Sequence, residues 1–442
     1  MATRTDVDDA GRRDDPDRRR AEHRDGTTGT SSATAPDRPG ATPPFTDRIR
    51  RHRWWIDALA VYLVVRAIGI LTLARFADLR DTTLGHALTV WDGQWMLAIA
   101  THGYGGVPAT LTDARGIHTS DTAYAFFPGY PYLVGFLAKL PGVTPFGAAL
   151  TLNLVLGCVA AVGAARLGMV CARMMADRSP IGRAPERTTG LFLVVLFAAT
   201  PMSIVLNMAY TEAMFCALAT WALVGILERR WLLAGVMAAL CGLCRPTAAV
   251  IIGVVVLAAA VFLWKTRGDN DSANTATRVR ALVAIIVSPA GYLAYLGVVW
   301  AHTGSPTGWF RIQTEGWDTE FDWGVAAFNF VNEQLVNASD VAPVATSWIV
   351  LSTLLMLCVG VWARLPWPVL LFGSLLVAQI VLSSGLMMSR PRLLLPAFVL
   401  LIPLAMALAR MRRVTAALVV VPIVVGSSWF GAHMLTVFPH AM

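Results

Sequence analysis

Residues 54–76 read WWIDALAVYLVVRAIGILTLARF, and this stretch decides the class of fold. It is apolar over about 20 residues, the length that an α-helix needs to cross a bilayer core of about 30 Å. Similar runs follow, and 56% of the 442 residues are hydrophobic while 14% are charged. Soluble domains have about 25% charged residues. The sequence therefore predicts an all-α polytopic membrane protein, with residues 54–76 retained as its first span.

The basic residues predict the topology, because cytoplasmic loops carry an excess of Arg and Lys. We attribute the formal charge of +8 to this effect, so no nucleic-acid partner is expected. The basic stretches at 173–187, 228–230, 265–280 and 410–413, together with Arg364, then all lie in the cytoplasm. This arrangement predicts about eleven transmembrane helices, at 54–76, 146–172, 189–208, 211–228, 231–245, 248–264, 279–301, 344–363, 367–386, 393–409 and 414–435.

The rest of the chain divides accordingly. Residues 1–50 are rich in Arg, Asp, Pro, Gly, Ser and Thr, which predicts a disordered cytoplasmic tail before a transmembrane domain at 54–436. Two long loops, 79–145 and 302–343, should face the outside. The short apolar run at 130–140 could be an extra span, but it would put residues 173–187 outside; we prefer a juxtamembrane helix. We expect a multi-pass protein of the inner (plasma) membrane with a functional outer face.

The first outer loop holds an unusual group of residues. Trp91-Asp92-Gly93-Gln94-Trp95 is followed by His102-Gly103-Tyr104 and then by Phe126-Phe127-Pro128-Gly129-Tyr130-Pro131. Trp and Tyr favour the membrane–water interface. We expect a helix lying in that interface with Asp92 at its start. Asp92 could be simply a helix cap, or it could be a general base held at the membrane surface.

Charges on the outer face have no topological purpose and need another explanation. A charge at mid-membrane costs about 2.5–3.5 kcal/mol, so such residues usually have partners or tasks. The planar fork of Arg suits phosphate. One carboxylate beside several arginines predicts that a lipid-linked phosphate is held while an acceptor hydroxyl is deprotonated, which is sugar transfer from a polyprenyl-phosphate donor. The same groups could instead bind anionic phospholipids without chemistry.

The candidate site residues follow from this hypothesis. Asp92 is the catalytic candidate, and Arg245, Arg390 and Arg392 are the candidates for binding the donor phosphate or lipid. Arg66, in the middle of the first span, should pair with a carboxylate or reach the interface. The substrate-binding candidates are Trp91, Trp95, Tyr104, Phe127, Tyr210, Glu212 and Arg311.

Metal and cofactor sites are not expected. His86, His102 and His118 with Asp113 and Asp121 match no standard spacing of metal ligands. The chain also lacks the glycine-rich loops that bind nucleotides. The predicted partners are therefore a polyprenyl-phosphate mannose donor, a glycolipid or glycan acceptor, and membrane lipids.

Several of these motifs, taken in order, resemble those of the PIG-V-like (GPI mannosyltransferase II-related) family. They are Trp91-Asp92 with Gly103-Tyr104, Ala125-Phe126-Phe127-Pro128, Ala209-Tyr210-Thr211-Glu212-Ala213-Met214-Phe215, Cys244-Arg245-Pro246 and Arg390-Pro391-Arg392-Leu393-Leu394-Leu395-Pro396. The resemblance implies a GT-C-type glycosyltransferase with juxtamembrane helices in its first outer loop, a polyprenyl-phosphate mannose donor, and a catalytic acidic residue at Asp92. Val90 stands where eukaryotic members commonly have Arg, and Arg245-Pro246-Thr247-Ala248 replaces their Arg-Ser-Asn-Gly element.

Two other classes of protein remain possible on the sequence. A transporter or flippase for a lipid-linked sugar would have inverted repeats and helices broken at mid-membrane; repeats are not evident, although Pro201, Pro246 and Pro289 could break helices. A non-catalytic membrane subunit of a glycosylation complex could lack the outer carboxylate, whereas Asp92 is present.

Overall fold

The computed structural model describes residues 53–268, 272–337 and 340–438, and the regular structure in these ranges is helical. One isolated antiparallel bridge, between Phe321 and Ser383, is the single β pairing that these ranges contain. The prediction of an all-α chain is confirmed. The predicted tail at 1–50 lies outside the described residues.

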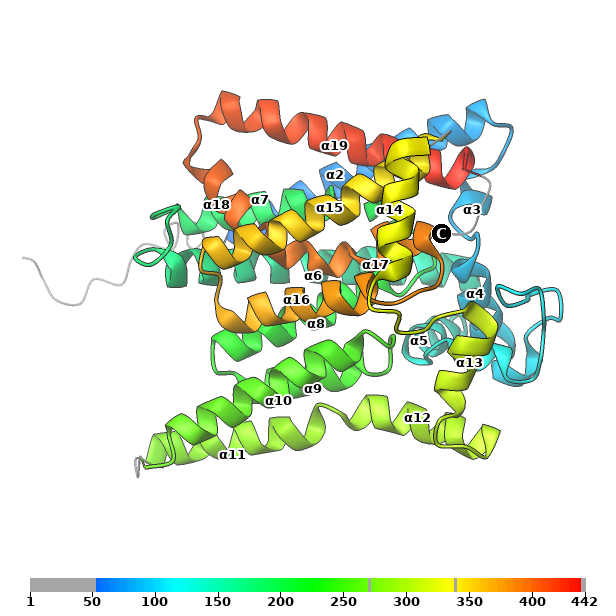
Figure 1. The fold of residues 1–442 in the computed structure, drawn as a ribbon, viewed down its shortest axis with the longest axis horizontal. Helices are drawn as coiled ribbons and strands as arrows, with labels where there is room; N and C mark the ends of the chain where they lie inside the picture. Colours follow the sequence, from blue (N-terminus) through cyan, green and yellow to red (C-terminus); the bar gives the residue numbers. More distant parts are fainter. Residues whose placement is uncertain (1–52, 269–271, 338–339, 439–442) are drawn as a thin grey trace, which may run out of the picture. The chain divides into compact units, whose positions relative to one another are not determined.

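The helices follow one another in the order shown in Figure 1. They are α2 (Trp54–Leu79), α3 (Leu84–Ala87), α4 (Asp92–His102), α5 (Gly129–Leu137), α6 (Pro145–Met175), α7 (Glu186–Ala198), α8 (Glu212–Leu227), α9 (Trp231–Cys241), α10 (Ala248–Lys265), α11 (Ser272–Val287), α12 (Ala290–Thr303), α13 (Gly308–Trp317), α14 (Val325–Asn337), α15 (Val341–Trp362), α16 (Trp367–Val381), α17 (Arg390–Leu393), α18 (Ile402–Arg410) and α19 (Arg413–Thr436). Short 3₁₀ helices occur at η1 (Tyr104–Gly106), η2 (Thr122–Ala125), η3 (Ser203–Asn207), η4 (Met387–Ser389) and η5 (Leu395–Leu401).

Each predicted span overlaps at least one of these helices. In the described part of the chain, six helices are long and apolar enough to cross a membrane, or seven if the bent pair Met387–Leu393 and Leu395–Arg410 forms one span. Three more apolar helices, α8, α9 and α16, are shorter. The chain is thus a multi-pass membrane protein, while the count of eleven spans stays a prediction. Helix α5 has nine residues, too few to span, as expected for 130–140.

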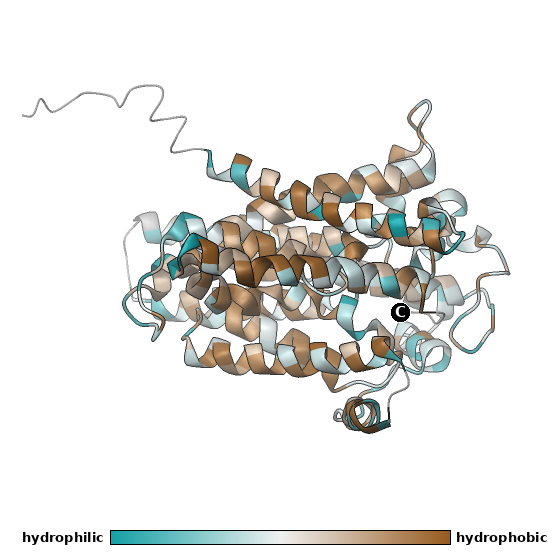
Figure 2. Cartoon of the chain, turned by 90° about the horizontal axis from the view of Figure 1, so that it is seen from above, coloured by the Kyte–Doolittle hydropathy of each residue, from teal (hydrophilic) through white to brown (hydrophobic). Residues whose placement is uncertain are grey.

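Basic loops that were predicted to share one side of the membrane contact one another. Arg410 Nη1 donates to the backbone oxygen of Arg183 at 2.8 Å, and Arg364 Nη1 donates to that of Arg178 at 3.1 Å. These loops lie at one end of the bundle, whereas α4, α5 and α13 lie at the other (Figure 1). Figure 2 shows apolar residues along the helices and hydrophilic ones gathered near the two ends.

The centre of the bundle is α6, which packs against α7 and α8. Small residues let these helices approach closely, as is typical of membrane helices. A Cβ added to Gly190 would lie 2.6 Å from the backbone oxygen of Ala165, and one added to Gly168 would lie 3.0 Å from Cα of Gly190. Any larger residue at either glycine would push α6 and α7 apart.

The helical structure is interrupted near three prolines, which lack the N–H that a continuous helix needs. Helix α7 ends before Pro201, the α9–α10 junction contains Pro246, and Pro289 separates α11 from α12. A fourth interruption bends the segment 387–410 by 54°. Two of these interruptions, at 242–247 and at 387–394, carry the arginines predicted to bind phosphate.

The contacts of Arg66 differ from those that the sequence predicted. Its side chain neither pairs with a carboxylate nor reaches the interface. It is buried, and it donates to Asn207 Oδ1 at 2.7 Å, to the Ala198 backbone oxygen at 2.9 Å and to Ser203 Oγ at 2.8 Å. These acceptors lie at the interruption between α7 and η3, where the helix leaves carbonyl groups without partners. Arg66 therefore stabilises a broken helix.

Candidate functional site

Asp92 is the first residue of α4, and the backbone just before it is strained. Trp91 occupies the N-cap position with φ 53° and ψ −117°, a conformation that costs a bulky residue about 1–3 kcal/mol. Asp92 is not the N-cap residue of α4, and its carboxylate contacts Arg392. The Asp92 Oδ2 atom lies 2.6 Å from Arg392 Nη1.

A chain of four charged side chains starts from this ion pair. Arg392 Nη1 also lies 3.4 Å from Oε1 of Glu212, and the same oxygen lies 3.2 Å from Nη1 of Arg245. Glu212 is fully buried, and the side chains of Arg245 and Arg392 are 8% and 9% exposed. Residues from α4, α8, α17 and the α9–α10 junction thus meet at one point.

Aromatic rings and backbone contacts hold the chain in place. The guanidinium of Arg392 lies over the ring of Tyr210 at 5.3 Å, and that of Arg245 lies over Phe215 at 5.6 Å. The Tyr210 hydroxyl donates to the Val90 backbone oxygen at 3.1 Å. This bond ties the start of α8 to the strained turn that presents Asp92.

Gly129 brings the first outer loop against the α9–α10 junction. Its N–H donates to the Leu243 backbone oxygen at 2.7 Å, and a Cβ at this position would lie 2.7 Å from the same oxygen. Only glycine permits this approach. The contact fixes the position of Arg245, two residues after Leu243.

A cavity of about 900 Å³ opens beside the charged residues. Asp92, Arg245, Arg390 and Arg392 line it, together with Phe127. A volume of this size accommodates a drug-sized or larger ligand. Glu320 also lines the cavity, and Glu212 lies behind the wall, so three arginines stand against three carboxylates. The planar fork of each arginine suits the oxygens of a phosphodiester.

Several donors at the cavity have no partner within the protein. Among the described residues, the Thr247 and Ser389 hydroxyls and Arg390 Nε are buried without a hydrogen bond, and all three residues line the cavity. Arg390 otherwise donates to the backbone oxygens of Ser383 and Ser384. A buried donor without a partner costs about 1–3 kcal/mol, so these atoms indicate a ligand that would accept from them.

The Asp92 carboxyl has a pKa above its usual range. Burial is the largest cause; the Arg392 guanidinium opposes it, and the Glu212 carboxylate adds to it. The side chain nevertheless keeps 27% of its surface exposed, so a hydroxyl in the cavity can reach it. A raised pKa makes the carboxylate a better proton acceptor.

The other substrate-binding candidates have different places. Trp95 is buried and stacks on Phe126 with ring centroids 5.1 Å apart. Tyr104 stacks on Tyr124 and donates to the Phe126 backbone oxygen at 2.8 Å; like Trp91, neither of these candidates is among the residues lining the cavity. Arg311 lies on the exposed face of α13, outside the cavity.

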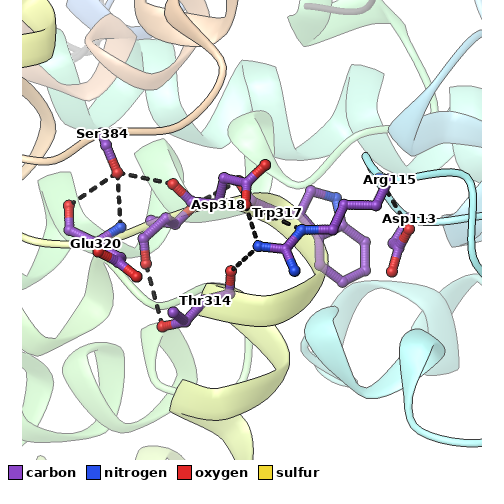
Figure 3. A network of polar contacts seen from close by, with 8 residues as sticks. Asp113, Arg115, Thr314, Trp317, Asp318, Glu320 and Ser384 are labelled. Atoms are coloured by element: carbon purple, nitrogen blue, oxygen red, sulfur yellow. Dashed lines mark hydrogen bonds and ion pairs between the residues drawn. The ribbon is translucent and has the colours of Figure 1, made fainter.

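One wall of the cavity comes from α13 and the segment after it, held by the polar network in Figure 3. The Ser384 hydroxyl donates to the Asp318 backbone oxygen at 2.7 Å and accepts from the Glu320 N–H at 2.9 Å. Arg115 forms an ion pair with Asp318. The network joins the loops 107–121 and 383–386 to the end of α13.

Sequence reasoning missed several residues of this site. Thr247 and Ser389 line the cavity, and Asn153, which is fully buried, donates to the Tyr210 backbone oxygen at 3.0 Å. A lone asparagine inside an apolar span was the signal for the last. No group of three or more His, Cys, Asp and Glu side chains able to hold a metal ion occurs in the ranges that the structure describes.

Solved structures align with this chain, whereas sequence comparisons find no match. No protein-family profile matches the chain, and no curated protein matches it. ArnT from Cupriavidus metallidurans bound to undecaprenyl phosphate aligns with a TM-score of 0.46 and 13% identity, over 84% of this chain and 63% of that one. The apo form of that protein gives 0.47 and 13%, over 85% and 75%. The archaeal oligosaccharyltransferase AglB from Archaeoglobus fulgidus, in complex with an inhibitory peptide and a dolichol-phosphate, gives 0.44 and 13%, over 88% and 56%. The chain thus spans less than two thirds of the length of the first of these structures.

Proposed function

We propose that the chain is an integral membrane glycosyltransferase of the GT-C type. It transfers a sugar, mannose in the first instance, from a polyprenyl-phosphate donor to a lipid-linked or cell-envelope glycan acceptor. The observation that carries the proposal is the chain Asp92–Arg392–Glu212–Arg245 on the wall of a cavity of about 900 Å³. The ordered resemblance to PIG-V-like proteins supports mannose as the sugar.

The proposed reaction is a single inverting displacement. The acceptor hydroxyl gives its proton to Asp92 as its oxygen attacks the anomeric carbon, and the carbon–oxygen bond to the phosphate breaks on the opposite face. Polyprenyl phosphate leaves with the bonding electrons, and Arg245, Arg390 and Arg392 stabilise the charge that grows on it.

Arg392 contacts Asp92 and would also bind the donor phosphate. Its contact with Asp92 at 2.6 Å opposes the rise in the pKa of that carboxyl. A donor phosphate would compete for the same guanidinium, so Asp92 becomes a stronger base when the donor is bound. We place this site on the outer face of the inner membrane, with the N-terminus in the cytoplasm.

The test is a transfer assay. Membranes containing the chain are given radiolabelled polyprenyl-phosphate mannose and extracted glycolipids. We expect label in a glycolipid or glycan product with inverted anomeric configuration. Membranes with Asp92→Asn serve as the matched control. Absence of product with mannose and with other polyprenyl-phosphate sugars would refute the proposal.

The alternative of a carrier for a lipid-linked sugar gains one observation, because the segment 387–410 is bent by 54° and broken helices are typical of transporters. The same assay separates the two functions. A carrier would move the labelled donor across the membrane unchanged, and Asp92→Asn would leave that movement intact.

A further inference from the structure

Helix α13 presents an uncharged aromatic face to the cavity. Trp309, Gln313 and Trp317 recur every fourth residue, so they lie on one face of the helix, and all three line the cavity. Arg311 and Glu315 lie on the exposed part of the same helix. Phe310 and Thr314 of α13 also line the cavity, so the lining part of this helix carries no charge, while the arginines lie elsewhere on the wall.

Trp309 has an unmet hydrogen-bonding capacity. Its side chain is 7% exposed, and its indole Nε1 has no hydrogen-bond partner among the described residues. The ring meets the ring of Phe127 edge to face, with centroids 5.7 Å apart. A wall built for packing alone would favour aliphatic side chains, which carry no such donor.

Gln313 is held in one orientation. Its Nε2 atom donates to the backbone oxygen of Ala125 at 3.1 Å, which leaves the amide oxygen as an acceptor. Beyond it, Trp317 packs edge-on against Phe126 at 5.7 Å. The polar network of Figure 3 fixes the end of the helix. This wall is therefore pre-organised for a ligand.

We propose that this face of α13 binds an uncharged pyranose ring, belonging either to the donor or to the acceptor. The C–H groups of a pyranose pack on the negative face of an aromatic ring. Its hydroxyl groups can donate to the Gln313 amide oxygen and accept from the Trp309 indole. Arginines hold the phosphate, and α13 selects the sugar. The inference rests on the proposed function and adds to it the residues that recognise the carbohydrate.

The experiment uses the full chain in detergent or nanodiscs with a polyprenyl-phosphate hexose and an extracted glycolipid. KM is measured separately for the two lipids in Gln313→Leu, which keeps the size and removes the amide, and in Trp309→Phe, which keeps a ring and removes the N–H. We expect KM for one lipid to rise about tenfold in Gln313→Leu and severalfold in Trp309→Phe, with kcat and the other KM near their unaltered values. Which KM rises identifies the ring as that of donor or acceptor.

Glu315→Gln is the matched control, because Glu315 is exposed on the same helix and does not line the cavity; it should change neither constant. Size exclusion and thermal unfolding establish that each variant is folded. Unchanged KM for both lipids in folded Gln313→Leu and Trp309→Phe, with transfer intact, would overturn the pyranose site and leave the proposed function standing. An unaltered chain that neither transfers nor binds either lipid would overturn both.

Discussion

Replacing Asp92 with Asn separates proton transfer from everything else that Asp92 does. The amide has nearly the same size, and its oxygen can still accept from Arg392, which lies 2.6 Å from the carboxylate in the unaltered chain. It cannot take a proton from an acceptor hydroxyl. We expect turnover to fall by about 10²–10⁴-fold, which corresponds to about 2.7–5.4 kcal/mol of activation free energy at about 1.36 kcal/mol per decade.

Unlike turnover, binding of the donor should not be weakened by Asp92→Asn. Two unit charges about 4 Å apart near a protein surface attract by about 4 kcal/mol, and the 27% exposure of Asp92 places the pair with Arg392 in that regime. Losing this attraction frees Arg392 for the donor phosphate, while Glu212 still neutralises it at 3.4 Å. The Kd for the donor should therefore stay equal or decrease.

Single-turnover transfer of radiolabelled sugar, combined with equilibrium donor binding, measures both effects on purified protein. Asp78→Asn is a suitable control, because Asp78 forms an exposed ion pair with Arg75 on α2 and does not line the cavity. Near-normal turnover by folded Asp92→Asn would remove Asp92 from the mechanism. Loss of donor binding would instead assign Asp92 a structural role.

The remaining predictions concern pH, phosphate binding and topology. Because the pKa of Asp92 is raised by burial and the base must be ionised to act, kcat/KM should fall on the acidic side at a pH above the usual carboxyl value of about 4; a rate that is constant down to that value would contradict this. Arg245→Lys keeps the charge but loses the fork, so the donor Kd should rise about tenfold in a binding assay, and an unchanged Kd would exclude a phosphate contact. A cysteine introduced at Pro180 should react only with membrane-permeant reagents, because this loop contacts the basic loop at Arg410 and basic loops face the cytoplasm; labelling by an impermeant reagent from outside would reverse the topology.

The sequence predicted those features that depend on local composition. The apolar runs predicted the helices, and the positions of the arginines predicted that the basic loops lie at one end of the bundle. The sequence grouped Asp92, Glu212, Arg245, Arg311, Arg390 and Arg392 as charges without a topological purpose. The structure joins Asp92, Glu212, Arg245 and Arg392 by ion pairs. Their pairing was not predictable, because Arg392 lies 180 positions beyond Glu212 and no local pattern encodes such a contact.

Two departures of the structure from the expectations have physical causes. Arg66 was expected to need a carboxylate, but the broken end of α7 supplies neutral acceptors instead. Arg311 was chosen from the second outer loop for its charge, whereas the fold turns it outward and brings Trp309 and Gln313 of the same helix to the cavity. Their four-residue spacing was present in the sequence, yet it predicts only a shared face and not which face is covered.

The order in which the charges leave the ribosome has a consequence for biogenesis. Membrane helices are inserted as they are synthesised, and a lone charge in the bilayer is costly. Glu212 precedes Arg245 in the chain, whereas its second partner, Arg392, is made 180 residues later. The nascent chain thus holds Glu212 with one of its two arginine partners through the synthesis of α10 to α16. A chain truncated before residue 387 should insert without Arg392 and remain a target for membrane quality control.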